Sequence, residues 1–173
     1  MDEVEIEDYD PGWPELFAAE AACLRPAFGP VLVALKHIGS TSVPGLAAKP
    51  VVDIQAVVRS LSDMDAVTPR VVALGWAQGI FALDPDRRLY FKKYNADGIR
   101  TWQLHVYEAS HPSASAHLLF RDYLRTHEEE AGRYEALKRD LALRFHFDRL
   151  AYNEAKTEYI EAIVVKAREQ AHG

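Results

Sequence analysis

The first third of the chain alternates between a helical pattern and short apolar runs. Apolar residues recur at helical spacing over residues 15–27, directly after a turn that contains Pro and Gly, and predict a helix there. Residues 31–38 and 51–58 are short, apolar and β-branched, which is typical of two neighbouring strands. Alternation along the second strand places Asp53 and Gln55 on the same face.

The middle of the chain predicts one helix followed by a hairpin. Ser62 with Asp65 three residues later has the pattern of a capping box, so a helix is expected to run towards Leu74, with a kink or a restart at Pro69. Residues 95–98 read Asn-Ala-Asp-Gly, a hairpin signal between the runs 89–94 and 101–107. Alternation places two sets of side chains on opposite faces of the second run: Thr101, Gln103, His105 and Tyr107 on one, and Trp102, Leu104 and Val106 on the other.

The last third of the chain is helical in pattern. After His111-Pro112 proline is absent and glycine nearly so, and helices are expected near residues 115–126, 128–145 and 153–171. Strands first and helices last predict an α+β fold, with a mixed or antiparallel sheet flanked by helices and a helical C-terminal third. With 173 residues the chain fits one domain, residues 1–173.

Composition narrows the class of protein. The net charge of −6 argues against broad affinity for nucleic acid, which depends on Lys and Arg at phosphates, and so disfavours an RNA-binding module. No apolar run is long enough to span a membrane and no leader is evident at the first residues, so a cytoplasmic location is expected. The single cysteine, Cys23, cannot form an internal disulfide and is expected to pack within the first helix.

The loop between the first two predicted strands concentrates small polar residues. Gly39 and Ser40 directly after a strand let backbone N–H groups and a hydroxyl approach a phosphate, and Thr41 and Ser42 add donors. Lys49 is a candidate counter-charge, although this loop lacks the spacing of a Walker sequence. The alternative is a tight turn whose hydroxyls bond their own backbone, with a solvated lysine.

A family resemblance rests on this loop and on three C-terminal segments. The string HIGSTSVPGLAAKP at residues 37–50, followed by Asp53-Ile54, resembles the signature of the GrpB family. That family is placed in the nucleotidyltransferase-fold superfamily and also occurs fused to the C-terminal side of some bacterial dephospho-CoA kinases. The similarity covers residues 11–163 and includes Phe120-Arg121-Asp122-Tyr123-Leu124-Arg125, Tyr134 with Leu137-Lys138, and Tyr152 with Ala155-Lys156-Thr157.

The superfamily resemblance implies a mechanism for part of the motif. In such enzymes a Gly-Ser turn holds nucleotide phosphates, and an Asp-x-Asp pair with a third carboxylate on a later strand binds two Mg²⁺ ions. Asp53 matches the first carboxylate and is the expected Mg²⁺ ligand, but Gln55 stands at the second position and is a weaker ligand for a hard dication. The later strand offers no carboxylate, and a single Mg²⁺ between Asp53 and a ligand's own phosphates stays open. His105 is either a catalytic base or ligand, or a packed, hydrogen-bonded histidine.

Basic residues on the predicted helices complete the expected site. Arg121 and Arg125 lie one turn apart, as do Tyr152 and Lys156, so each pair shares a helix face. The four basic residues Arg121, Arg125, Lys138 and Lys156 are expected to face the loop as an anion pocket, a solvated face being the alternative. Arg87-Arg88 and Lys92-Lys93 could contact a nucleotide or a short RNA, or be surface charge.

Two functional hypotheses follow. The first is a Mg²⁺-dependent nucleotidyl or phosphoryl transferase with Asp53 and His105 as catalytic residues. The second is a non-catalytic ligand-binding or accessory domain that kept the turn and lost the carboxylates. Both bind a phosphate-bearing small molecule, either a nucleotide or a CoA-like ligand, through the same expected set of residues: His37, Gly39, Ser40, Thr41, Ser42, Lys49, Arg121, Arg125, Lys138, Tyr152 and Lys156.

Overall fold

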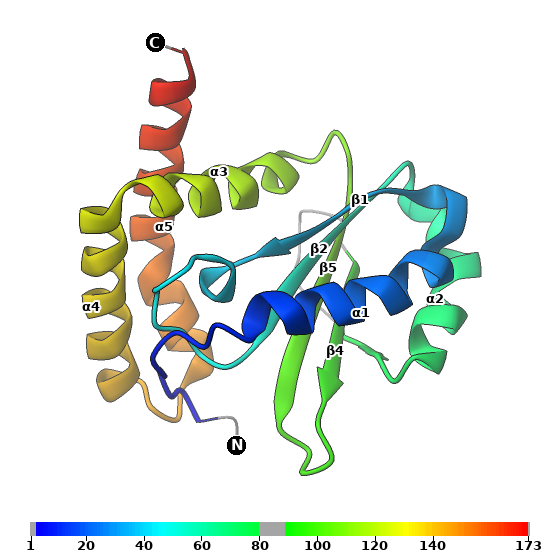
Figure 1. Ribbon diagram of the computed structural model, residues 1–173, viewed down its shortest axis with the longest axis horizontal. Helices are drawn as coiled ribbons and strands as arrows, with labels where there is room; N and C mark the ends of the chain where they lie inside the picture. Colours follow the sequence, from blue (N-terminus) through cyan, green and yellow to red (C-terminus); the bar gives the residue numbers. More distant parts are fainter. Residues whose placement is uncertain (1–2, 80–88, 173) are drawn as a thin grey trace.

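A mixed β-sheet with helices on both faces is the framework of the protein (Figure 1). The computed structural model describes residues 3–79 and 89–172. Within these residues the sheet has the strand order β1-β2-β5-β4-β3. The strands are β1 (Leu32–Ile38), β2 (Val52–Val58), β3 (Ala77–Gln78), β4 (Leu89–Tyr94) and β5 (Arg100–Glu108).

The register of the sheet brings the loop and the later strand to one place. Strand β1 pairs antiparallel with β2, with Ile38 opposite Asp53. Strand β2 pairs parallel with β5, with Asp53 opposite Gln103 and Gln55 opposite His105. The loop that follows β1 therefore returns directly above the first residues of β2.

One face of the sheet is covered by α1 (Trp13–Phe28) and α2 (Met64–Ala73). The main core lies there, because alternation points Ile54, Ala56 and Val58 of β2 towards these helices. The opposite face of β2, which carries Asp53 and Gln55, is left for the loop and the C-terminal helices.

The C-terminal helices α3 (Pro112–Thr126), α4 (Glu128–Arg144) and α5 (Arg149–His172) gather beside one end of the sheet (Figure 1). Their shared core includes Phe120, Leu124 and Tyr134, and it also takes in Val43 and Leu46 from the loop. The loop is thus anchored by burial of its own apolar residues among these helices, which is the physical reason that it can hold a fixed shape.

The α+β class and the expected strands and helices are confirmed, with boundaries that differ by a few residues. Two local expectations are wrong. The Ser60 side chain, not that of Ser62, accepts a backbone N–H, and it opens a short 3₁₀ turn before α2. Cys23 is exposed instead of packed, because it lies on the outer side of α1.

Three further expectations concern Pro69, the Arg87-Arg88 pair and membrane-spanning helices. Pro69 lies inside α2, which continues through it from Met64 to Ala73. Arg87 and Arg88 lie outside the described residues. No helix in residues 3–79 and 89–172 combines the length and the apolar character needed to cross a bilayer.

Candidate functional site

The turn after β1 is built around Gly39. Its φ of 71° is in the left-handed region that favours glycine. A Cβ at this position would lie 2.5 Å from Oδ2 of Asp53, so only glycine allows this approach. The Ser42 hydroxyl donates to the Gly39 carbonyl at 2.6 Å and closes the 3₁₀ turn Ser40–Ser42. The turn and the Asp53 carboxylate are therefore in direct contact.

A cavity of about 110 Å³ opens between this turn, β2 and the two last helices. Seven of the expected site residues line it: Ser40, Thr41, Lys49, Asp53, Lys138, Tyr152 and Lys156. Its wall is completed by five residues that the sequence did not single out as site residues: Ala48, Val51, Gln103, Arg149 and Asn153. The loop, the strand and the helices thus contribute to one site.

Tyr152 is a buried platform for two of the cavity's lysines. The Nζ atoms of Lys156 and Lys49 lie 4.3 and 5.1 Å from the centroid of its ring. Such cation–π contacts hold an ammonium without neutralising it. Within the part of the chain that the structure describes, no carboxylate forms an ion pair with Lys156. Burial lowers the pKa of Lys156 to about 8, and Asp53 opposes that shift.

Lys138 is the deepest basic residue of the cavity, with 2% of its surface exposed. Its ammonium donates to the carbonyl oxygen of Ala47 and lies 4.9 Å from the ring centroid of Tyr134. Burial, reinforced by the positive charge of Lys156, lowers the pKa of Lys138 to about 7. An anion that enters the cavity would stabilise the charged form of this lysine relative to its neutral form.

Among the described residues that line the cavity, Asp53 is the single carboxylate, and polar neighbours surround it. Its Oδ1 lies 3.6 Å from Nε2 of His105. The side-chain amide of Gln103 forms hydrogen bonds at both its nitrogen and its oxygen in one of its two orientations. In that orientation the nitrogen donates to Asp53 at 3.1 Å and the oxygen accepts from Arg149 at 2.5 Å. A chain of contacts therefore links α5 to the carboxylate through β5.

Gln55 does not reach the cavity, although it shares a strand face with Asp53. The side chain is fully buried, its Nε2 donates to the carbonyl of Ala114 at 3.0 Å, and its Oε1 accepts from Nδ1 of His117 at 3.0 Å. Both of its ends are therefore occupied by α3. The residue at the position of the second carboxylate is part of the packing between sheet and helix.

This donor set does not fit a two-metal centre. Two divalent ions close together need several anionic ligands, and the described part of the cavity wall offers one. Glu108, the last residue of β5, accepts from the backbone N–H of Leu61 at 2.9 Å, so its carboxylate is used there. Among residues 3–79 and 89–172, no three His, Cys, Asp or Glu side chains are grouped as metal ligands would be.

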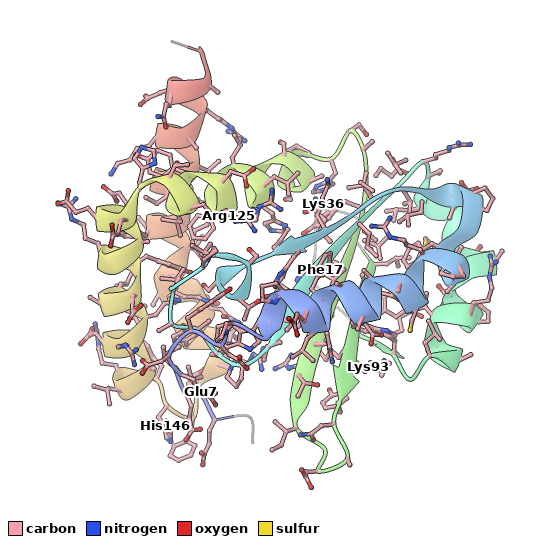
Figure 2. All side chains as sticks on the ribbon, viewed as in Figure 1. Glu7, Phe17, Lys36, Lys93, Arg125 and His146 are labelled. Atoms are coloured by element: carbon pink, nitrogen blue, oxygen red, sulfur yellow. The ribbon has the colours of Figure 1, made fainter. Side chains whose placement is uncertain are left out.

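Arg121 and Arg125 lie outside the cavity wall and hold the loop from α3. Arg121 donates to the carbonyl of His37 at 3.0 Å, and Arg125 donates twice to the carbonyl of Ser42, at 3.0 and 2.6 Å. Figure 2 shows Arg125 between α3 and this turn. These bonds fix the orientation of the turn's peptides; direct contact of either arginine with a ligand stays a prediction.

His37 is also behind the cavity wall. The residue is 6% exposed, and its ring stacks on Phe17 at 4.9 Å and hydrogen-bonds the Thr41 hydroxyl at 2.9 Å (Phe17 is labelled in Figure 2). Burial lowers its pKa to about 4, so it is neutral at pH 7. It supports Thr41, which does line the cavity.

Some of the cavity residues could have been found from the sequence and others could not. Gln103 lies on the same predicted strand face as His105, so alternation already pointed it towards Asp53. Arg149 and Asn153 carry no local signal, because α5 begins earlier than its pattern indicated and tertiary packing alone brings its first turns to the loop.

The fold is similar to that of a known class of proteins. A crystal structure of the Cid1 poly(U) polymerase, in a form bound to MgATP, has a TM-score of 0.56 to this chain at 15% identity and covers 87% of this chain and 50% of that one. At this identity the likeness concerns the fold alone. The protein therefore has a nucleotidyltransferase-like α+β fold, as expected.

The chain belongs to the GrpB family, since the family profile described as GrpB protein matches residues 3–166. The crystal structure of the conserved protein GrpB from Enterococcus faecalis has a TM-score of 0.87 at 31% identity and covers 98% of this chain and 100% of that one.

Two curated relatives are longer proteins. The UPF0157 protein YqkA of Bacillus subtilis is 37% identical over 174 residues, which are 98% of this chain and 49% of YqkA. A dephospho-CoA kinase of Mycolicibacterium paratuberculosis is 30% identical over 169 residues, 85% of this chain and 42% of the kinase. The chain thus spans about half the length of YqkA and less of the kinase.

Proposed function

We propose that this protein binds the phosphate group of a small molecule, a nucleotide or a CoA-like compound, in the cavity beside the Gly39–Ser40 turn. The observation that carries the proposal is the charge of the wall: four basic side chains surround one carboxylate, although the whole chain has a net charge of −6. The basic residues are Lys49, Lys138, Arg149 and Lys156.

The surroundings of the basic residues support an anion as the occupant. Lys138 and Lys156 are desolvated, and in residues 3–79 and 89–172 neither forms an ion pair with a carboxylate, so their buried charge raises the free energy of the empty site. The hydroxyls of Ser40 and Thr41 supply neutral donors at the same wall. A phosphate oxygen would be a partner for both kinds of group.

The relatives support a nucleotide or CoA-like compound as the source of the phosphate. The Cid1 structure named above is bound to MgATP and shares the fold. One relative in sequence is a dephospho-CoA kinase. Neither fact identifies a ligand for this chain, and both suggest which compounds to test first.

The transferase hypothesis keeps one specific observation in its favour, the 3.6 Å separation between Asp53 and His105. That pair could position a proton at a substrate hydroxyl. The burial of Gln55 and the single carboxylate at the cavity favour a binding protein over a metal-dependent catalyst. Bound ligand that is turned over, with loss of turnover in His105→Gln, would reverse this preference.

Calorimetric titration of ATP, ADP, CoA and dephospho-CoA, each with and without Mg²⁺, tests the proposal. At least one compound should bind, and Lys156→Met should weaken it by about 10- to 100-fold, as expected for loss of one charge-assisted contact. The matched control is Lys166→Met on the same helix, because Lys166 is exposed and pairs with Glu130 at 2.8 Å. Equal affinities in the two variants would remove the cavity from the binding site.

A further inference from the structure

We propose that Glu135 and Arg139 of α4 are positioning residues of the cavity, and that through them anion binding is coupled to the association of residues 3–8 with the loop. The inference rests on the proposed function, because the coupled event is the binding of an anion beside Lys138. Its basis is a continuous series of hydrogen bonds that runs from Lys138 to Asp8.

Helix α4 holds both polar backbone groups of Ala47, the loop residue that precedes Ala48 of the cavity wall. The N–H of Ala47 donates to Oε2 of Glu135 at 3.0 Å, and its carbonyl oxygen accepts from Lys138. Ala47 is buried, so these two side chains take the place of water at its backbone. Glu135 and Lys138 share a face of α4, one turn apart. A shift of Glu135 would therefore displace the ammonium of Lys138 through Ala47.

Arg139 extends this contact to residues 3–8. Its Nε and Nη2 atoms lie 3.1 and 3.0 Å from Oε1 of Glu135, and Nη2 lies 2.6 Å from Oδ1 of Asp8. Nη1 also donates to the carbonyl of Ile6 at 3.5 Å. Glu135 thus accepts from the loop at one carboxylate oxygen and from Arg139 at the other. Only a carboxylate can do this, because a glutamine amide accepts at one end only.

Residues 3–8 also bond the backbone of the cavity wall directly. Glu7 and Ala48 exchange two backbone hydrogen bonds of 2.9 Å each and form an antiparallel bridge (Glu7 is labelled in Figure 2). The buried side chain of Val4 belongs to the same apolar cluster as Tyr152, the platform of two cavity lysines. The segment therefore supports the cavity at one loop residue and at one aromatic residue of α5.

This segment should open more easily than the sheet. The side chains of Asp8 and Arg139 are 95% and 41% exposed, and an exposed ion pair contributes little to stability. Segments with few buried contacts open locally, at a lower free energy than global unfolding. Residues 3–8 therefore have two accessible arrangements, associated with the loop and released from it.

An anion in the cavity should favour the associated arrangement. Burial lowers the pKa of Lys138 to about 7, and the charge of Glu135 opposes that shift. The anion favours the charged form of Lys138, whose bond to the Ala47 carbonyl is then charge-assisted and stronger. The loop is held more firmly at Ala47, and so is its pairing with Glu7. By thermodynamic linkage, association of residues 3–8 should raise the affinity for the anion by the same factor.

Amide hydrogen exchange with and without inorganic pyrophosphate tests the coupling in the natural protein. Pyrophosphate contains the phosphoanhydride linkage that ATP and CoA share. At saturation it should slow exchange of the Glu7 and Ala48 amides by about fivefold or more, the lower end of typical coupling. The control is the Asn95 amide, which donates to Ile99 at 2.9 Å in the turn between β4 and β5 and should not change. No slowing at Glu7 and Ala48, or equal slowing at Asn95, overturns the inference and leaves the proposed function standing.

Calorimetric titration of pyrophosphate into variants tests the two positioning residues. Glu135→Asp keeps a carboxylate near Lys138 but shortens its reach to Ala47, and it should weaken binding by about three- to tenfold. Arg139→Met should weaken it by about three- to fivefold, whereas Arg133→Met, an exposed control on the same helix, should stay within about twofold. In the Glu135→Asp background, Arg139→Met should add less than about twofold, because both changes act through one contact.

Two outcomes of the titrations overturn the inference. Unchanged affinity in Glu135→Asp would mean that Glu135 acts through its charge alone, and fully additive effects of the two substitutions would mean that they act separately. If a variant does not fold, the exchange measurement on the natural protein decides. If the natural protein binds neither pyrophosphate nor ATP nor CoA, the proposed function fails and the inference fails with it.

Discussion

Two positions on one face of β2 lie only two residues apart and have opposite surroundings. Asp53 keeps 25% of its side chain exposed and lies at the wall of a cationic cavity. Gln55 is completely buried, with both ends of its amide bonded to α3. What separates them is the helix above each position: the first turns of α3 cover Gln55, whereas α4 and α5 leave a space over Asp53.

The difference shows how a family motif should be interpreted. A glutamine at the second position of an Asp-x-Asp pair suggests a weakened metal ligand when only the strand is considered. In the folded protein this glutamine connects the sheet to the backbone of Ala114 and to His117, so it serves stability. On this face of β2, only Asp53 is placed to contact a ligand. Substitutions of Gln55 should therefore change stability, whereas substitutions of Asp53 should change ligand binding.

The largest effect is expected from Gln55→Asp. The shorter carboxylate would lose the bond donated to Ala114 and place a charge in a fully buried site, which should lower the free energy of unfolding by about 3 kcal/mol or more. Urea denaturation at pH 7 measures the change. The matched control is Gln78→Asp on the exposed strand β3, where about 0.5 kcal/mol is expected. A stable Gln55→Asp protein that binds Mg²⁺ more tightly would show that this position belongs to the open site.

Acid should lower the free energy of unfolding through His37, which is buried behind the cavity wall. Its pKa in the folded protein is about 4, against an ordinary value of about 6.5, so the unfolded chain binds the proton more tightly. The stability that His37 contributes is complete above pH 6.5 and is lost as pH falls towards 4, by about 2 kcal/mol at pH 5.

The contribution of His37 is separated from that of other groups by comparing unfolding of the natural protein and His37→Phe at pH 7.5 and pH 5. The variant should lose less stability between the two pH values, because Phe can stack on Phe17 but does not titrate. The same acid sensitivity in both proteins would mean that His37 is not the buried group responsible.

The sequence allowed the elements and the turn to be predicted, but not the separation of the two ends of β2. Period and turn signals are local, and they gave the strands, the helices and the turn at Gly39. The cover of Gln55 by Ala114, and the arrival of Arg149 at the cavity, depend on packing between segments distant along the chain. Arg121 and Arg125 illustrate the same limit, since their spacing showed a shared face but not that they bond the loop's carbonyls.

Arg125→Ala should have an intermediate effect on stability, because it loosens the loop. It removes two hydrogen bonds to the Ser42 carbonyl and should cost about 1–2 kcal/mol of stability, with a several-fold loss of pyrophosphate affinity because the turn is less well fixed. Arg133→Ala on α4 is the control, since Arg133 is exposed and bonded only to Glu129 and Glu130 within the described chain. If affinity falls by 100-fold while stability is unchanged, Arg125 contacts the ligand itself, as first expected from the sequence.

The smallest effect on stability, and the most informative on function, is expected from Asp53→Asn. The amide oxygen of asparagine can still accept from Gln103, so the free energy of unfolding should change by less than about 1 kcal/mol. Pyrophosphate affinity in EDTA should rise several-fold, because a negative charge beside the phosphates is removed. The titration belongs at pH 6.5, where Lys156 remains protonated even though loss of Asp53 lowers its pKa further. If Asp53→Asn instead binds pyrophosphate more weakly, and if Mg²⁺ strengthens binding by the natural protein but not by the variant, then Asp53 is a ligand of a metal ion. That result would support the transferase hypothesis.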